Sequence, residues 1–297
     1  MTVETSSDKV SEGYSRPASI EERSNRFFVH PISQIFAGLA IKLKISANAV
    51  SVLGLLSGWL AAGLYFFQPD KLMIIGGFIA MIFWHILDGA DGRVARATGT
   101  TSAFGRLIDG VCDHLVFAAV YISITISMIM QGGHWSLWII VLSAGASHAT
   151  QAAGYEERRQ KFQRRMRGIA RDKANEKNFE INNRKSFFAI GYDFLQRFVG
   201  GDPHSPLDDA LEQNRVQNGD IPVDIINLTA PNVRAWSLLN ANNRTIAIFL
   251  ACMIGKPLYY FVWELVILNL ALLALIFYEK RTETEIANQV RQNQQTR

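Results

Sequence analysis

Blocks of about 20 mostly apolar residues recur along this chain, separated by segments that hold most of its charges. An α-helix needs about that many residues to cross the hydrocarbon core of a bilayer. A water-soluble domain would instead spread its apolar residues at the period of a helix or a strand. The pattern therefore predicts an all-α integral membrane protein, although the 297 residues include 30 Lys and Arg and 26 Asp and Glu.

Six transmembrane helices are predicted from these blocks. Their expected ranges are 46–67, 72–87, 104–130, 135–154, 245–261 and 263–278. The last two blocks almost touch, so a re-entrant hairpin is an alternative for that pair. Before the first span, apolar residues between 27 and 41 recur at helical spacing and are flanked by Lys and Arg. They predict an amphipathic helix that lies along the membrane interface.

The spans divide the chain into parts of different composition. A long segment between the fourth and fifth spans begins basic and ends acidic, and it is expected to form a cytoplasmic insertion. The expected parts are a disordered tail at 1–22, the interfacial helix and first four spans at 23–154, the insertion at 155–243, the last two spans at 244–280 and a cytoplasmic tail at 281–297.

The distribution of charge predicts the orientation of the spans. Lys and Arg collect in the loops on one side, and the other side receives only Lys71 and Lys256. By the positive-inside rule, both termini and the insertion are cytoplasmic. The net charge of +4 suits an anionic membrane face better than nucleic acid. Glu264, in the sixth predicted span, is expected to reach the outer interface or to pair with Lys256.

Four aspartates gather where the second predicted helix leaves the membrane and the third enters it: Asp88, Asp91, Asp109 and Asp113. Spacings of three and four residues put each pair on one face of its helix. Carboxylates at such depth are costly and usually functional, and four of them repel unless cations neutralise them. An all-oxygen ligand set favours two hard ions, Mg²⁺ or Mn²⁺.

Glycines and one arginine accompany these carboxylates. Gly92 and Gly105 allow close approach of a ligand or of another helix. The forked guanidinium of Arg96 suits a phosphate held by the same metals. Together the residues indicate phosphoryl chemistry, in which two cations clamp a pyrophosphate.

The stretch 88–113 resembles the signature of the CDP-alcohol phosphotransferase (CDP-alcohol phosphatidyltransferase) family. That signature is D-x-x-D-G-x-x-A-R, eight residues, then G-x-x-x-D-x-x-x-D, and every fixed position is matched. The resemblance implies transfer of a substituted phosphate, favouring a phosphatidyl group from CDP-diacylglycerol, to the hydroxyl of an alcohol with release of CMP. It also implies a role in phospholipid biosynthesis and a homodimer. The positive-inside rule places the aspartates, and so the active site, at the cytoplasmic face.

The family's residue roles carry over by position. The four aspartates would hold the two metal ions, and Asp113 would also be the catalytic base that takes the acceptor's proton. The residues implied at the nucleotide are Gly92, Arg96, Ser102, Gly105, Asn48 and Ser51, although Ala47 replaces the proline usual before the last two. Candidate residues for the acceptor are Arg106, His148, Gln151 and Arg158.

Other functions remain open from the sequence. The first alternative is transfer from a soluble CDP-alcohol to a lipid hydroxyl, of diacylglycerol or of a sphingoid lipid. A membrane CDP-lipid hydrolase and a cation transporter are weaker alternatives, since a transporter would leave the glycines and Arg96 without a purpose. No residue identifies the acceptor alcohol.

Overall fold

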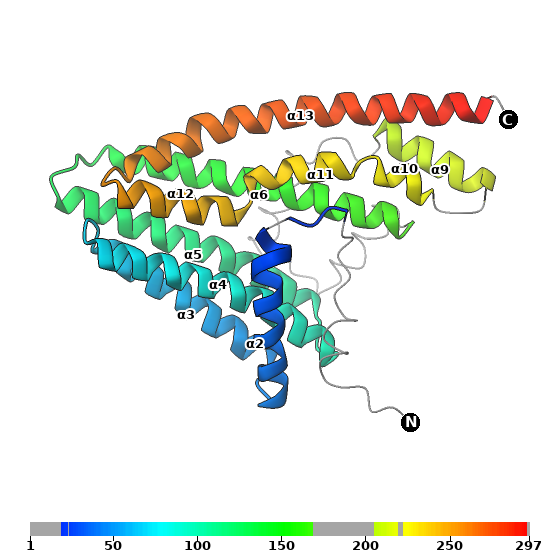
Figure 1. Cartoon of the computed structure of the whole chain (residues 1–297). Helices are drawn as coiled ribbons and strands as arrows, with labels where there is room; N and C mark the ends of the chain where they lie inside the picture. The colour runs from blue at the N-terminus through cyan, green and yellow to red at the C-terminus, as the bar shows by residue number, and fades with distance from the viewer. Residues whose placement is uncertain (1–18, 23, 169–204, 219–221, 296–297) are drawn as a thin grey trace, which may run out of the picture. The chain divides into compact units, whose positions relative to one another are not determined.

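The computed structural model describes residues 19–22, 24–168, 205–218 and 222–295, with the side chains of 103–109, 217–218 and 293–295 outside the description. Within these ranges every regular element is a helix, which confirms the all-α class (Figure 1). The elements are η1 Asn25–Val29, α2 His30–Lys42, α3 Ala47–Phe66, α4 Lys71–Ala97, α5 Ala103–Met130, α6 Leu137–Met166, α9 Pro206–Asn218, α10 Val223–Asn227, α11 Ala230–Trp236, η2 Ser237–Leu239, α12 Ala241–Met253 and α13 Leu258–Gln295.

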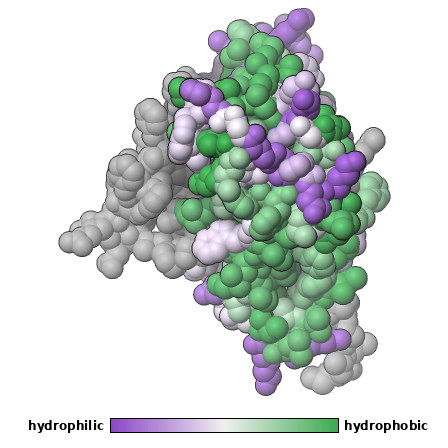
Figure 2. Space-filling view, turned by 90° about the vertical axis from the view of Figure 1, so that its left-hand side faces the viewer, coloured by the Kyte–Doolittle hydropathy of each residue, from purple (hydrophilic) through white to green (hydrophobic). Residues whose placement is uncertain are grey.

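Four of the described helices are long and apolar enough to cross a membrane. These candidate spans are α3, α4, the part Gly110–Met130 of α5 and the part Leu258–Gln292 of α13. Hydrophobic side chains cover much of the face drawn in Figure 2, as expected for helices that face lipid. Several apolar helices therefore fit an integral membrane protein.

The predicted count of six spans is not confirmed. Helix α6 begins apolar, but its second half is strongly charged. Helix α12 has 13 residues, and at 1.5 Å per residue it would span roughly 20 Å, less than the hydrocarbon core. Both helices carry the apolar blocks on which the fourth and fifth spans were predicted.

The break between the last two predicted spans lies earlier than expected. The sequence suggested a division near Val262, whereas α12 ends at Met253 and α13 begins at Leu258. Gly255 adopts a left-handed conformation, with φ of +69°, and terminates α12, while Pro257 precedes α13. Because the flanking residues are apolar on both sides, hydropathy alone placed the division wrongly. Helix α13 also runs without a break through the region expected to be a separate tail.

The described helices fall into two compact units. The first comprises Glu21–Ser147 and Ala241–Leu265, and the second comprises His148–Asn240 and Val266–Arg297 with the short segment that holds Ile20. The chain passes between the units inside α6, inside α13 and, outside any helix, between Asn240 and Ala241. Each unit is held by its own apolar core.

In the first unit, α3 packs against α4 and α5, while α2 and α12 pack against α4. Small residues allow the approach of α3. A Cβ atom on Gly58 would lie 2.4 Å from Cγ2 of Val116, a residue of α5. Ala61 and Ala62, one turn further along α3, are buried in the core cluster that also contains Val116. Close helix packing through small residues is typical of membrane bundles, where no hydrophobic effect drives helices together.

Replacing Gly58 with leucine should therefore destabilise the first unit. The added side chain has no room beside Val116, and such overpacking typically costs about 1–3 kcal/mol or more. The midpoint of thermal unfolding of the purified protein should fall clearly. Gly63→Ala is the matched control, because no atom lies within 4 Å of a Cβ at that position. Equal midpoints for the two variants would contradict the close packing of α3 on α5.

The second unit contains described parts of the predicted insertion together with the last part of α13. Its core includes Phe162 of α6, Leu207 of α9, Ile226 of α10 and Ile286 of α13, all buried. The segment predicted as an insertion thus supplies helices that pack against a common core with α13. Residues 1–18 of the expected disordered tail lie outside the described part of the chain.

Candidate active site

The predicted metal-binding carboxylates lie on the adjoining ends of α4 and α5. The rings of Trp84 and Phe117 make an edge-to-face contact between these helices, with centroids 5.5 Å apart. Asp88 follows Trp84 by one helical turn, and Asp113 precedes Phe117 by one turn. Each aspartate is therefore on the helix face that makes the contact, one turn nearer to the connection between α4 and α5. Asp88 and Asp113 are half-buried.

Helix α3 reaches the same site through Ser51. The Ser51 hydroxyl donates a hydrogen bond to Oδ2 of Asp91 at 2.5 Å, and Asp91 is only 7% exposed. A charge-assisted hydrogen bond of this length orients the acceptor carboxylate. The sequence assigned Ser51 to the nucleotide, whereas here its contact is with a predicted metal ligand. Asn48, one turn earlier, is exposed.

The glycines near the aspartates have two different surroundings. A Cβ on Gly92 would lie 3.3 Å from Nη1 of Arg96, so the exposed guanidinium folds back over that glycine. A Cβ on Gly89 would lie 2.7 Å from the Ser33 hydroxyl, which donates to the carbonyl of Ile86 at 2.8 Å. Gly89 thus serves the packing of α2 on α4, while Gly92 leaves space beside a cation.

Three predicted site residues cannot be placed beyond the backbone. Gly105, Arg106 and Asp109 belong to the first two turns of α5, and their side chains lie outside the described residues. Ser102, just before α5, is exposed. The four aspartates would offer a hard divalent cation the all-oxygen donor set it prefers. Among the side chains that are described, however, no three His, Cys, Asp or Glu gather closely enough to hold one ion.

Two polar contacts beside the aspartates could not be predicted from the sequence. Nη2 of the buried Arg93 donates to the carbonyl of His30 at 3.4 Å, which ties α4 to the start of α2. Nε2 of His85, one turn before Asp88, lies 2.9 Å from the Thr245 hydroxyl on α12. Both contacts join segments distant in the sequence, so spacing along the chain could not reveal them.

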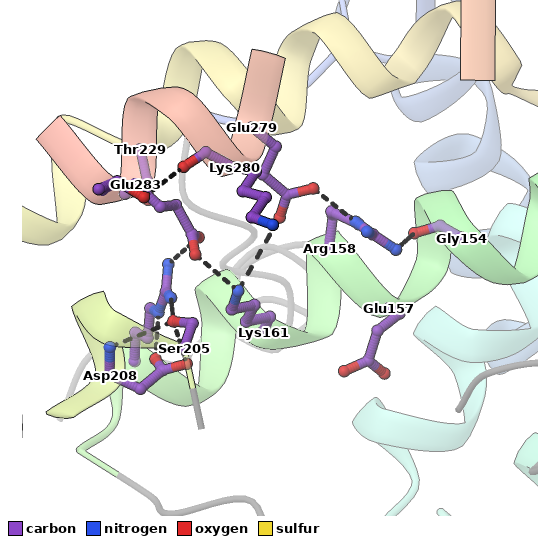
Figure 3. Close-up of polar contacts among 12 residues, drawn as sticks. Gly154, Glu157, Arg158, Lys161, Ser205, Asp208, Thr229, Glu279, Lys280 and Glu283 are labelled. Carbon is purple, nitrogen blue, oxygen red and sulfur yellow. Dashed lines mark hydrogen bonds and ion pairs between the residues drawn. The ribbon is translucent and has the colours of Figure 1, made fainter. Parts of the chain in front are cut away.

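Three candidate acceptor residues belong to the second unit. Nε2 of Gln151 donates to Oδ1 of Asn269 at 3.0 Å, and His148 is 5% exposed. Nε of Arg158 donates to Oε2 of Glu279 at 2.8 Å (Figure 3). The Arg158 guanidinium also lies 4.0 Å from the ring centroid of Trp236. In the structure, Gln151 and Arg158 therefore bind partners within that unit.

An ion cluster crosslinks α6, α9 and α13 in the second unit. Nζ of Lys161 lies 2.9 Å from Oε2 of Glu283, and Nη1 of Arg165 lies 2.7 Å from Oε1 of the same carboxylate (Figure 3). Nε of Arg165 lies 2.6 Å from Oδ1 of Asp208, whose Oδ2 accepts a hydrogen bond from Ser205. Burial opposes ionisation of Asp208, but the charge and hydrogen bond of Arg165, the Lys161 cation and the Ser205 hydrogen bond together outweigh it and lower the pKa of that carboxyl.

The lowered pKa of Asp208 implies a pH-dependent contribution to stability. Its folded-state pKa lies below the ordinary 3.8, so the contribution is present above that pH and is lost as the pH falls through the folded value. At neutral pH, Asp208→Asn should reduce stability by about 1–3 kcal/mol. Thermal midpoints of the two proteins should converge once the pH falls below the folded-state pKa of Asp208. Asp209→Asn, at an exposed neighbour, is the control and should change little. A difference that persisted in acid would contradict the ion pair.

Comparison with known proteins places the motif in its family. Residues 44–171 match the family model of CDP-alcohol phosphatidyltransferase. The archaetidylinositol phosphate synthase of Pyrococcus horikoshii is 30% identical over 112 residues, which are 38% of this chain and 55% of that protein. The bifunctional IPC transferase and DIPP synthase of Aquifex aeolicus is 38% identical over 73 residues, 25% of this chain and 16% of that protein.

The matches are partial in extent. The chain spans about half of the Pyrococcus protein and a smaller part of the Aquifex protein. The matched range nevertheless holds α3, α4 and α5 with the whole aspartate motif. At residues 44–171 this chain therefore carries a domain of the CDP-alcohol phosphatidyltransferase family.

Proposed function

We propose that this protein transfers a phosphatidyl-type group from a CDP-linked lipid to the hydroxyl of an alcohol and releases CMP, in phospholipid biosynthesis. The observation that carries the proposal is the complete aspartate motif, from Asp88 to Asp113, within the matched domain. CDP-diacylglycerol is the proposed donor. The domain's family acts on CDP-alcohol and lipid substrates, and the apolar helices suit a donor that stays in the bilayer.

The proposed metal ligands are Asp88, Asp91, Asp109 and Asp113, holding two Mg²⁺ or Mn²⁺ ions. Their oxygen donors fit hard cations, and the family is generally dependent on divalent metals. Bound metal would polarise the pyrophosphate and stabilise the charge that develops on it. Ser51 supports this assignment, because its hydrogen bond fixes the orientation of the Asp91 carboxylate.

Asp113 is the proposed general base. The acceptor oxygen attacks the phosphorus that carries the lipid, the bond from that phosphorus to the CMP oxygen breaks, and the acceptor proton moves to the Asp113 carboxylate. Arg96 is proposed to bind the nucleotide phosphates, with Gly92 leaving the backbone open beside it. Asn48, Ser102 and Gly105 complete the proposed nucleotide site. Catalysis then consists mainly of positioning and electrostatic stabilisation.

The proposed acceptor is a phosphorylated polyol of the inositol phosphate class. The name of the Pyrococcus relative includes such a group in its product. Arg106 is the proposed contact for the acceptor's phosphate, because it follows the motif glycine Gly105. The active site and both termini are proposed to face the cytoplasm, following the bias of Lys and Arg, and the protein is proposed to be a homodimer.

The test is an assay of the purified protein in lipid nanodiscs with Mg²⁺ or Mn²⁺ and labelled CDP-diacylglycerol. Separate reactions contain inositol phosphate, glycerol 3-phosphate, inositol, serine or water alone. We expect CMP and a labelled phosphodiester lipid that depend on a phosphorylated polyol. Free phosphatidate with water alone would indicate a hydrolase instead. Product formed only from a soluble CDP-alcohol and a lipid hydroxyl would assign the lipid to the acceptor side.

A further inference from the structure

A fully buried ion pair joins α12 to α13 in the first unit. The side chains of Arg244, in the first turn of α12, and Glu264, in α13, are both 0% exposed. Nε of Arg244 donates to Oε2 of Glu264 at 3.0 Å, and Nη2 donates to Oε1 at 3.2 Å. The sequence suggested Lys256 or the interface as the partner of Glu264, and this was wrong. Ionisable groups inside a membrane bundle are expensive to desolvate and are usually functional.

The carboxylate of Glu264 is held by more than the arginine. The Tyr260 hydroxyl donates to Oε2 of Glu264 at 3.1 Å. The Tyr260 hydroxyl in turn forms a short hydrogen bond with the hydroxyl of Tyr121, on α5. These contacts fix Glu264, and through it Arg244, relative to the helix that carries Asp113.

Arg244 belongs to the turn of α12 that contacts α4 close to the aspartate motif. Its neighbour Thr245 contacts His85, which is one turn before Asp88. Arg244 is also within electrostatic range of His114, the residue after Asp113. Glu264, by contrast, contacts Tyr260, in the first turn of α13. The pair therefore presents its positive end toward the helix ends that carry the carboxylates.

We propose that Arg244, held by Glu264, is a fixed counter-charge for the carboxylates of the candidate active site. This inference rests on the proposed function, since it concerns the same aspartates. Their mutual repulsion is offset in part by a cation that cannot move away, so the ends of α4 and α5 stay aligned before a metal binds. The same cation weakens the binding of a divalent ion. Arg244 is a positioning residue and does not contact the reacting atoms.

The inference can be tested by equilibrium binding of Mn²⁺ alone to the purified protein in nanodiscs, measured from the electron paramagnetic resonance signal of free Mn²⁺. In Arg244→Met/Glu264→Met the pair is replaced by two apolar side chains, which buried pairs often tolerate. Without the nearby cation, the Kd for Mn²⁺ should fall on the order of 5-fold. Arg244→Lys keeps the charge and should keep the wild-type Kd. Ser127→Ala, which removes a buried polar contact with Gln68, is the neutral control.

If the double variant folds and its Kd for Mn²⁺ is unchanged or higher than that of the wild type, the inference is wrong. The ion pair would then serve only to pack α12 against α13. If the double variant does not fold, the Glu264→Gln variant provides the test. Glutamine has nearly the shape of glutamate but carries no charge, so the Arg244 cation loses its balancing negative charge. Mn²⁺ should then bind several-fold more weakly, and unchanged or tighter binding would overturn the inference. This measurement needs no substrate. A wild-type protein that binds Mn²⁺ but releases no CMP would refute the proposed transfer alone.

Discussion

Asp113→Asn should reduce CMP release by about 1,000-fold, because removing a general base typically costs 10²–10⁴-fold and this residue is also a proposed metal ligand. The asparagine has the same size but cannot accept the acceptor's proton. Initial rates with saturating donor and acceptor measure the effect. Binding of CMP should change little, since the phosphate contacts are assigned to Arg96.

Two further variants make this result interpretable. Asp224→Asn removes an exposed carboxylate of α10, outside the motif, and should retain full activity. Arg96→Ala should instead weaken nucleotide binding, which isothermal titration would detect. Full turnover by Asp113→Asn would remove Asp113 as the base, and unchanged nucleotide affinity in Arg96→Ala would contradict the role given to the guanidinium.

Complete removal of divalent cations should bring CMP release to the background rate. The proposed ligands are carboxylates that repel each other without a cation, and their oxygen donors suit Mg²⁺ or Mn²⁺. Either ion, added back after chelation and dialysis, should restore the rate. The thermal midpoint, recorded in parallel, separates loss of catalysis from loss of fold. Undiminished CMP release after exhaustive chelation would contradict the metal-dependent mechanism.

The family assignment could be made from sequence because its signal is local. The fixed residues between Asp88 and Asp113 lie on two helices that follow one another, and each pair needs only helical spacing to share a face. Apolar blocks likewise identified the all-α membrane class, since the length of a span is set by the bilayer. These are properties of short segments, so they can be predicted without knowledge of tertiary contacts.

The contacts that were missed depend on partners distant in the sequence. Glu264 has Lys256 eight positions away, but its partner Arg244 lies beyond the turn at Gly255. Lys161 and Arg165 could have been solvated or lipid-facing, whereas both reach Glu283 of α13. Such ion pairs depend on which helices pack against each other in the folded protein. Hydropathy misplaced the last break because a single glycine turn between apolar segments does not change the average.

Two of the crossings between the compact units fall within α6 and α13, without an intervening linker in either helix, while the crossing between Asn240 and Ala241 lies outside any helix. At these two helix crossings a protein engineer therefore has no natural cut site: excising the second unit would sever two continuous helices and expose hydrogen-bonding groups of both backbones. Exchange of that unit with a relative's would require matching the rotational phase of both helices at once. Recombination between homologues should accordingly succeed at the loop between α5 and α6 more often than at the boundary between the units.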